Sequence, residues 1–431
     1  MKRRGSKSSQ ISVYDRMCWP MPALERALRQ GSHRRELAAY LGASEYDCLR
    51  SLARARSRVG SRSSYPKVYL LPGIMGSQLG SRRAVGEPPD LLWIDPSDIL
   101  RGRLAELRWG TRAKLEPLGA IVYSYLALKL RLQAAGFEVC LYDYDWRADL
   151  RTLGAALANR LRADASVRLA LVGHSMGGLV ARVALSHCAG HAVDTRITRV
   201  IGLGTPHGGA IAAVQALRAT YPVVLRLAAI DDRHTAADLS RRVFSSFMSV
   251  YQLLPIDGLE LDLFDARAWP RRGVRPPAAR LTAARGFELQ LARADARFAS
   301  IIGTGQRTVT GLERRGGEFH YEISAAGDGT VAAVRATLPG ARNYYLRCEH
   351  SELPRSELVS RALVDLLRSG RTRRLPQRPK VASGRRAHVS DADLTRSFPP
   401  HIDWQRLSAA ERRRYFARLN SPPSIYRPPA R

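Results

Sequence analysis

A serine between two glycines is the residue of this chain best suited to do chemistry. The segment Gly173-His174-Ser175-Met176-Gly177 follows an apolar run and precedes a helical pattern. A G-x-S-x-G sequence between a strand and a helix is typical of a nucleophile elbow, a tight turn that exposes the serine and leaves no room for a Cβ at the glycines. This spacing predicts that Ser175 attacks a substrate carbonyl and forms an acyl-enzyme.

A serine nucleophile needs a general base and a carboxylate that orients the base. With such an elbow these groups follow in the chain order Ser, Asp, His. Asp328 lies in a Gly-Asp-Gly turn, and His350 follows the segment Asn343–Leu346, which we expect to be a strand. We predict that Asp328 orients His350, which takes the serine proton and returns it to the leaving alcohol. The competing residues have the wrong order or place in the chain: Asp257, Asp262, Asp265 and His320.

The oxyanion formed during the attack needs two backbone donors that are already in place. The glycine-rich segment Pro72-Gly73-Ile74-Met75-Gly76 comes directly after an apolar run. We expect the amide of Met75 to approach the oxyanion from this loop, with the amide of Met176 as its partner.

Strand and helix patterns alternate in the middle of the chain, which indicates a mostly parallel sheet with helices on both faces. Helices are expected at Leu150–Ala163 and Gly178–Ser186. Strands are expected at Lys67–Leu71, Glu138–Tyr142, Val167–Val172, Thr198–Gly202, Ala299–Ile302 and Asn343–Leu346. The site should lie at the carboxyl ends of these strands.

About 90 residues separate the Gly-Thr-Pro-His-Gly-Gly segment from the strand at Ala299, which is more than a simple crossover needs. We therefore predict a helical cap at about residues 210–298, with apolar helices at Ile211–Leu217, Val223–Ile230 and Val243–Leu254. The candidates for substrate contact are Trp146, Phe247 and Tyr251, and packing on the sheet is the alternative role for each of them.

Positive charge gathers at the two ends of the chain. The 431 residues include 69 Lys and Arg against 38 Asp and Glu, a formal net charge of +31, and residues 1–62 and 371–431 carry most of the excess. We predict a basic N-terminal helical appendage over 1–62, a hydrolase domain over 63–370, and a basic, partly disordered tail with a short helix over 371–431. A charge of this size favours contact with anionic partners.

The terminal helices favour a membrane surface over nucleic acid as that partner. The expected helices Ala23–Gln30, Arg34–Leu41 and Glu45–Arg58, the last with Ser44 as N-cap, superficially resemble a helix-turn-helix. However, a recognition helix that begins with Glu45 and Asp47 would repel phosphate. Near the C-terminus, Ser408 and Glu411 form a capping box before a basic helix that could rest on anionic lipid or simply face solvent.

The sequence pattern indicates neither a targeting signal nor paired cysteines. The basic start of the chain is followed by no apolar run of the kind a secretory signal needs, and no segment reaches the roughly 18 apolar residues of a membrane span. Five widely spaced cysteines favour neither disulfides nor a zinc site. We expect a cytoplasmic protein, with peripheral contact to the inner membrane face as an option, and no metal or cofactor.

Seven motifs together resemble the bacterial branch of the lecithin:cholesterol acyltransferase-like α/β-hydrolases. In chain order they are PGIMGSQL, WIDP, YDWR, GHSMGG, GTPHGG, GDGTV and EHSELP. The resemblance covers about residues 65–368. It implies the α/β-hydrolase fold, a Ser175, Asp328 and His350 triad, an oxyanion hole at the Met75 and Met176 amides, and ester chemistry on lipids. The chain lacks cysteines between Cys48 and Cys140, where secreted and lysosomal members carry a disulfide-bonded loop.

The sequence therefore predicts a serine hydrolase that cleaves carboxylic esters, with lipid acyl esters as the expected substrates. An O-acyltransferase would use the same residues and differ only in the acceptor of the acyl group. A catalytically inactive hydrolase fold that binds nucleic acid or serves as a scaffold is a further alternative, which the complete set of triad residues argues against. A peptidase would share the fold and the triad but would have to cleave amides, and nothing in the sequence marks an acidic or basic specificity pocket.

Overall fold

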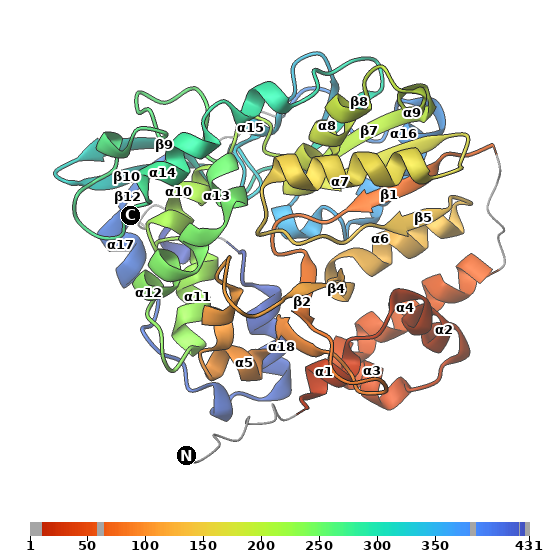
Figure 1. Ribbon diagram of the computed structural model, residues 1–431, viewed down its shortest axis with the longest axis horizontal. Helices are drawn as coiled ribbons and strands as arrows, with labels where there is room; N and C mark the ends of the chain where they lie inside the picture. Colours follow the sequence, from red (N-terminus) through yellow and green to blue (C-terminus); the bar gives the residue numbers. More distant parts are fainter. Residues whose placement is uncertain (1–10, 58–63, 380–384, 422, 427–431) are drawn as a thin grey trace.

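The structure is a computed structural model that describes residues 11–57, 64–379, 385–421 and 423–426. The expected boundary between residues 62 and 63 lies outside the described residues. Within them, a large sheet with helices on both faces lies in one half of the molecule, and a group of short helices with a small three-stranded sheet lies in the other (Figure 1).

The central sheet has six strands, and every neighbouring pair in it is parallel. All six expected strands are confirmed, with ends that differ by a few residues at most. Their apolar runs are buried on both faces, as in other parallel sheets. In spatial order they are β11 (Arg342–Arg347), β8 (Phe298–Thr304), β7 (Ile197–Leu203), β6 (Leu169–His174), β1 (Lys67–Leu71) and β5 (Val139–Leu141).

Alternate side chains of each strand feed two separate cores, because successive strand residues point to opposite faces. On β1, Tyr69 and Leu71 join the core beneath α7 (Leu150–Ala163) and α8 (Met176–Cys188), whereas Val68 and Leu70 join the core beneath α6 (Val122–Ala134) and α16 (Glu357–Ser369). The helix predicted at Leu150–Ala163 is confirmed at both ends.

The segment between β7 and β8 forms a group of short helices beyond one end of the central sheet (Figure 1). Two of its three expected helices are present as predicted, and the third is shorter because Phe244–Ser246 forms a separate 3₁₀ turn. The helices are α10 (Ile211–Leu217), α11 (Pro222–Ile230), α12 (Ala236–Arg242), α13 (Met248–Gln252) and α14 (Ala278–Ala284).

Two antiparallel sheets of three strands flank this group. One contains β2 (Ser77–Ser81), β3 (Asp90–Trp93) and β4 (Glu116–Ala120). The other contains β9 (Thr308–Arg315), β10 (Glu318–Ser324) and β12 (Ala387–Ser390). Because β12 pairs with β10, the C-terminal part of the chain is hydrogen-bonded into the body of the protein.

The N-terminal helices pack against the body rather than standing apart. They are α1 (Val13–Met17), α2 (Met21–Gln30), α3 (Arg34–Leu41) and α4 (Ala43–Ser57). Leu28, Leu37 and Leu49 share one core with Leu126 and Leu130 of α6. The expected N-cap at Ser44 is wrong, because Gly42 takes a left-handed φ of 93° that ends α3, and α4 begins directly after it.

The remaining helices are short. They are α5 (Pro96–Leu100), α9 (Ala192–Arg196), α15 (Ala333–Ala336), α17 (Asp391–Arg396) and α18 (Ala409–Ala417). The capping box predicted at Ser408 and Glu411 is present at the start of α18. Across the described residues, none of the helices has both the length and the apolar character that crossing a membrane requires.

Candidate active site

Ser175 lies at the turn between β6 and α8, with φ 53° and ψ −126°. The residues two positions before and after it are glycines because the turn is crowded. A Cβ on Gly177 would lie 2.5 Å from the carbonyl oxygens of Leu71 and Pro72, and one on Gly173 would lie 2.4 Å from the amide nitrogen of Gly178. The backbone of Ser175 thus has the strained conformation that a nucleophile elbow requires.

Asp328 and His350 are brought together in loops that follow β10 and β11. The Asp328 Oδ2 atom lies 2.7 Å from His350 Nδ1, and the His350 amide donates to the Asp328 carbonyl at 2.9 Å. Asp328 Oδ1 accepts from the amides of Thr330 and Val331 at 3.0 and 2.7 Å. With one oxygen held by the backbone, the other is free to fix the orientation of the imidazole.

A glycine of the GTPHGG motif makes room for this pair. A Cβ on Gly204 would lie 3.1 Å from both Asp328 Oδ2 and His350 Nδ1, and the residue has a left-handed φ of 58°. A glycine is therefore needed at position 204, because a larger residue would crowd Asp328 and His350. The sequence of the motif alone did not indicate this contact.

Ser175 and His350 both line one cavity of about 460 Å³, together with Met75. We call it the Ser175 cavity. Ser175 and His350 are buried apart from this cavity, with 7% and 5% of their surface exposed. The structure therefore places the predicted nucleophile and the predicted base on the wall of the same cavity, with Asp328 behind the base.

The loop that carries Met75 is braced by aromatic side chains. Trp93 donates from Nε1 to the Met75 carbonyl at 2.9 Å, and the Tyr144 hydroxyl donates to the carbonyl of Pro72. Among the described residues, no acceptor is recorded for the amides of Met75 and Met176. The Met176 amide opens α8, where the first N–H groups of a helix have no intrahelical partner. Neither amide is therefore committed to a protein acceptor, and their role as an oxyanion hole stays a prediction.

Tyr125 connects this loop to the loop of His350, and no sequence motif indicated it. Its hydroxyl accepts from the Gly73 amide at 2.9 Å and lies 2.8 Å from Nδ1 of His174, whose Nε2 lies 3.0 Å from the His350 carbonyl. A consistent proton arrangement has Tyr125 donating to His174 and His174 donating to the carbonyl. Tyr125 lies within the apolar helix α6, so its pattern predicts only packing.

Removing the Tyr125 hydroxyl should lower both stability and turnover. Tyr125→Phe leaves the Gly73 amide and His174 Nδ1 without their partner in a buried place, and such a loss costs about 1–3 kcal/mol. We expect a lower free energy of unfolding in urea and a lower kcat with p-nitrophenyl esters. The control is Tyr142→Phe, at a ring that packs between Tyr69 and Tyr144. Equal kcat in the two variants would contradict the role of the Tyr125 hydroxyl.

His174 should make stability depend on pH. Burial, with a smaller contribution from His350, lowers the pKa of His174 from 6.5 to about 3. Between these values the unfolded chain binds a proton that the folded chain does not, so stability falls as the pH drops from about 6.5 towards 3. In His174→Asn we expect this slope to be smaller by up to about 1.4 kcal/mol per pH unit in urea unfolding. The control His187→Asn, at an exposed histidine, should keep the slope of the wild type.

The three expected substrate contacts do not line the Ser175 cavity. Trp146 donates from Nε1 to the Ser77 carbonyl and packs against Phe247, and the hydroxyl of Tyr251 donates to the Ser245 carbonyl. All three side chains are fully buried in the core. For these residues the structure supports the packing alternative. Other apolar residues line the cavity instead, among them Ile74, Trp93, Phe244, Val250 and Leu253.

Both terminal segments contribute to the wall of the Ser175 cavity, which the sequence did not reveal. Tyr14 and Tyr40 come from the N-terminal helices, and Arg413, Phe416 and Leu419 come from α18 and the residues after it. The cavity is thus completed by parts of the chain that lie more than 300 residues apart.

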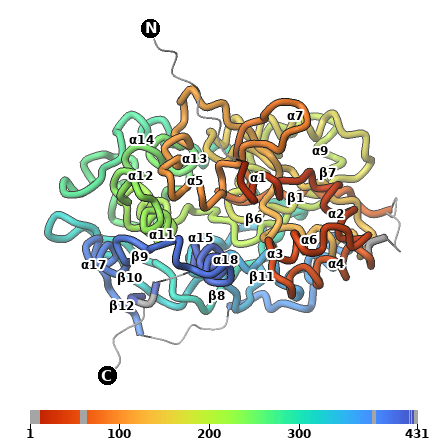
Figure 2. Tube along the Cα trace, turned by 90° about the horizontal axis from the view of Figure 1, so that it is seen from below, coloured from red at the N-terminus to blue at the C-terminus, as the bar shows by residue number. Residues whose placement is uncertain are grey.

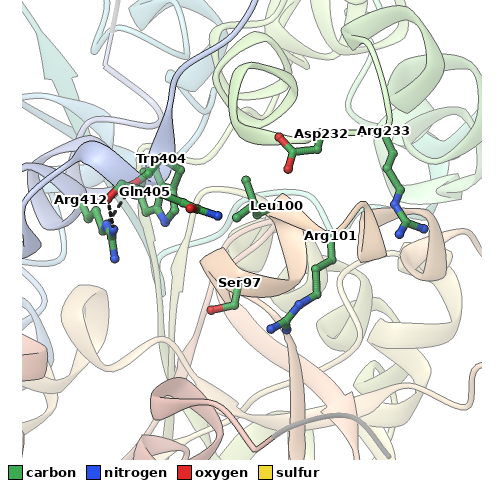
Figure 3. Close-up of a pocket in the computed structure, with 8 residues that line it drawn as sticks. All are labelled: Ser97, Leu100, Arg101, Asp232, Arg233, Trp404, Gln405 and Arg412. Atoms are coloured by element: carbon green, nitrogen blue, oxygen red, sulfur yellow. Dashed lines mark hydrogen bonds between the residues drawn. The ribbon is translucent and has the colours of Figure 1, made fainter. Parts of the chain in front are cut away.

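A second cavity, of about 430 Å³, contains none of the predicted site residues (Figure 3). It lies between α5, the residues after α11, and the C-terminal segment. Ser97 and Leu100 belong to the first, Asp232 follows the second, and Trp404 and Arg412 belong to the third. The guanidinium of Arg412 is bound to the carbonyls of Trp404 and Gln405, at 3.1 and 3.0 Å.

The parallel sheet, with a strained serine at the turn from β6 into α8, defines this chain as an α/β-hydrolase. The sequence model of the lecithin:cholesterol acyltransferase family matches residues 134–341, and this match confirms the resemblance found in the motifs. The chain is accordingly an enzyme of the esterase and acyltransferase class. The part of the chain before residue 134, which includes the N-terminal helices and the Met75 loop, and the part from β11 onward, which includes His350, lie outside the matched range. A search of curated proteins finds no match.

Several solved structures of bacterial hydrolases are similar to this chain. The mature form of Bacillus licheniformis lipase BlEst2 is 18% identical, covers 71% of this chain and 94% of its own, and has a TM-score of 0.37. A structure described as a putative aryl esterase from Burkholderia cenocepacia is 12% identical, with 72% and 92% covered and a TM-score of 0.33. Staphylococcus hyicus lipase is 13% identical, with 70% and 91% covered and a TM-score of 0.31.

Proposed function

We propose that this protein is a serine hydrolase that cleaves carboxylic esters of lipids, with Ser175 as nucleophile, His350 as base and Asp328 as orienting acid. The observation that carries the proposal is the Asp328–His350 hydrogen bond of 2.7 Å behind a cavity that both His350 and Ser175 line. The apolar side chains on the cavity wall suit an acyl chain, because burying it there removes apolar surface from water.

The proposed mechanism has two steps. His350 Nε2 takes the Ser175 proton as the hydroxyl oxygen bonds to the ester carbonyl carbon, and the Met75 and Met176 amides donate to the resulting oxyanion. The C–O bond to the leaving alcohol then breaks, and His350 gives its proton to that alcohol. Water repeats the sequence on the acyl-enzyme and releases the fatty acid.

An alcohol acceptor in place of water would make the same site an acyltransferase. The matched family is described by such an activity, so this alternative has specific support. In both cases the acyl-enzyme on Ser175 is the same, and only the second step differs.

The experiment is hydrolysis of p-nitrophenyl esters with acyl chains of two to sixteen carbons, followed by product analysis with and without added 1-octanol. Turnover that peaks at a medium or long chain supports a lipid esterase, and octyl esters among the products support acyl transfer. No turnover at any chain length, together with no labelling by a fluorophosphonate, would contradict the proposed mechanism.

A further inference from the structure

The C-terminal segment, residues 402–421, lies across the body beside the Ser175 cavity. Both views place α18 between α11 of the helical group and α3 of the N-terminal helices (Figures 1 and 2). The Tyr415 hydroxyl donates to the carbonyl of Arg226 in α11 at 2.7 Å, and Arg413 Nη1 donates to the carbonyl of Ala39 in α3 at 2.9 Å. The segment is thus tied on both sides and forms a fixed part of the cavity wall.

Two cations on this wall have no ion-pair partner within the part of the chain that the structure describes. The charged residues that line the Ser175 cavity are Glu352, Arg355, Arg413 and Arg414. Arg355 pairs with Glu352 at 2.7 Å, so these two charges cancel. Among the described residues, no ion pair is recorded for Arg413 or Arg414.

The carboxylate of α18 that lies near these arginines, that of Glu411, already accepts hydrogen bonds from Ser408. Glu411 lies three residues before Arg414, and its Oε2 accepts from the Ser408 amide at 2.8 Å and from the Ser408 hydroxyl at 2.6 Å, as part of the capping box. The Ser175 cavity therefore carries two guanidinium groups at one place that no ion pair among the described residues neutralises.

We propose that Arg413 and Arg414 form a subsite for an anionic oxygen group, a phosphate or a carboxylate, on the ester substrate. The inference rests on the proposed function and adds a specificity element to it. Guanidinium groups bind such anions with two parallel N–H···O bonds, and these charge-assisted bonds are among the strongest in proteins.

Two tyrosines line the same part of the wall. Tyr14 and Tyr40 line the cavity with their rings 5.7 Å apart, and Tyr40 directly follows Ala39, which Arg413 contacts. Burial raises the pKa of Tyr14 to about 12 and also raises the pKa of Tyr40. Both hydroxyls therefore keep their protons at neutral pH and can donate to an anion.

The position of the subsite along the segment limits the substrate. Asn420 donates to the Thr330 hydroxyl at 3.0 Å, beside Asp328, and Arg413 lies seven residues earlier. At a helical rise of 1.5 Å per residue, the four residues from Arg413 to the end of α18 at Ala417 span about 6 Å, and two turn residues follow before Asn420 is reached. A spacer of several bonds must therefore connect the reactive carbonyl to the anion, as in a long-chain dicarboxylic monoester or an acyl ester of a glycerol phosphate.

The first test measures binding without turnover. Octyl phosphate, octanoate and 1-octanol are titrated by calorimetry, below their aggregation limits, into the full chain and into Arg413→Gln/Arg414→Gln. We expect both anions to bind the wild type more tightly than 1-octanol, and the double variant to lose roughly 10- to 100-fold of that affinity. Tighter binding of the phosphate indicates a phosphate ester as the substrate, and tighter binding of octanoate indicates a carboxylate.

The second test measures selectivity with two esters of equal length, p-nitrophenyl octanoate and the mono-p-nitrophenyl ester of suberic acid. The ratio of their kcat/KM values should shift against the anionic ester by about 10-fold or more in the double variant. The single variant Arg413→Lys should stay closer to the wild-type ratio than the double variant does, because lysine keeps the positive charge. Arg412→Gln and Arg418→Gln remove neighbouring charges that do not line the cavity, so the ratio should stay that of the wild type.

Octyl phosphate that binds the wild type no more tightly than 1-octanol would overturn the subsite. So would a double variant that weakens the neutral and the anionic ligand equally, since that result indicates a purely structural role for the segment. Anion binding without any ester turnover would instead leave the subsite standing and reject the proposed function.

Discussion

Replacing Ser175 with alanine is expected to lower kcat for ester hydrolysis by about 10⁴-fold or more, with the fold retained. Alanine keeps the Cβ and removes only the oxygen that would bond to the acyl carbon. The two amides of the candidate oxyanion hole and the substrate cavity remain, so a small residual rate over water is expected. The measurement is turnover of the best p-nitrophenyl ester, with mass spectrometry of fluorophosphonate-treated protein.

The control for this variant is Ser186→Ala, at an exposed serine near the end of the same helix α8. It should keep both turnover and labelling. If Ser175→Ala is still labelled, or if both variants retain the wild-type rate, another residue is the nucleophile and the acyl-enzyme on Ser175 is wrong.

Asp328→Asn is expected to lower kcat by about 10³- to 10⁴-fold. Asp328 Oδ1 accepts from the amides of Thr330 and Val331, so the amide oxygen of asparagine should occupy this place and its NH₂ group should face His350. His350 Nδ1 can then only accept a hydrogen bond, which moves the ring proton to Nε2. A protonated Nε2 cannot take the proton of Ser175.

The matched control is Asp257→Asn, one of the acids that the chain order argued against. Its side chain is mostly exposed and pairs with Arg335 at 3.4 Å. We expect kcat close to that of the wild type. A comparable loss in both variants would show that Asp328 has no special role. The combination of Ser175→Ala with Asp328→Asn should lose little more than Ser175→Ala alone, because residues that act as a unit are not additive.

Much of the fold could be predicted from short stretches of sequence, because strand and helix periodicity are local properties. The six strands of the central sheet and the helix Leu150–Ala163 are examples. Where the structure differs from a helix boundary predicted from the sequence, the conformation of a neighbouring residue explains the difference. Gly42 with its left-handed φ set the start of α4, although Ser44 has the residue type of a good N-cap.

The candidate site was predictable where a residue type is tied to a backbone conformation or a chain order. Gly173 and Gly177 have no room for a Cβ, so they mark Ser175, and the order Ser, Asp, His narrows the search for its partners. Tyr125 carries no such mark. Its hydroxyl contacts Gly73 and His174, which lie about 50 residues away on either side, and an apolar helix pattern cannot report such contacts.

By itself, the sequence determined the strand order along the chain, the elbow around Ser175, and the class of chemistry that Ser175, Asp328 and His350 can perform. Only the tertiary structure decided what surrounds that chemistry. In the folded protein Trp146 lies in the core, whereas Tyr14 and Arg413 lie on the cavity wall. The physical reason is that a cavity is bounded by whichever distant segments pack together, and no local pattern encodes that packing.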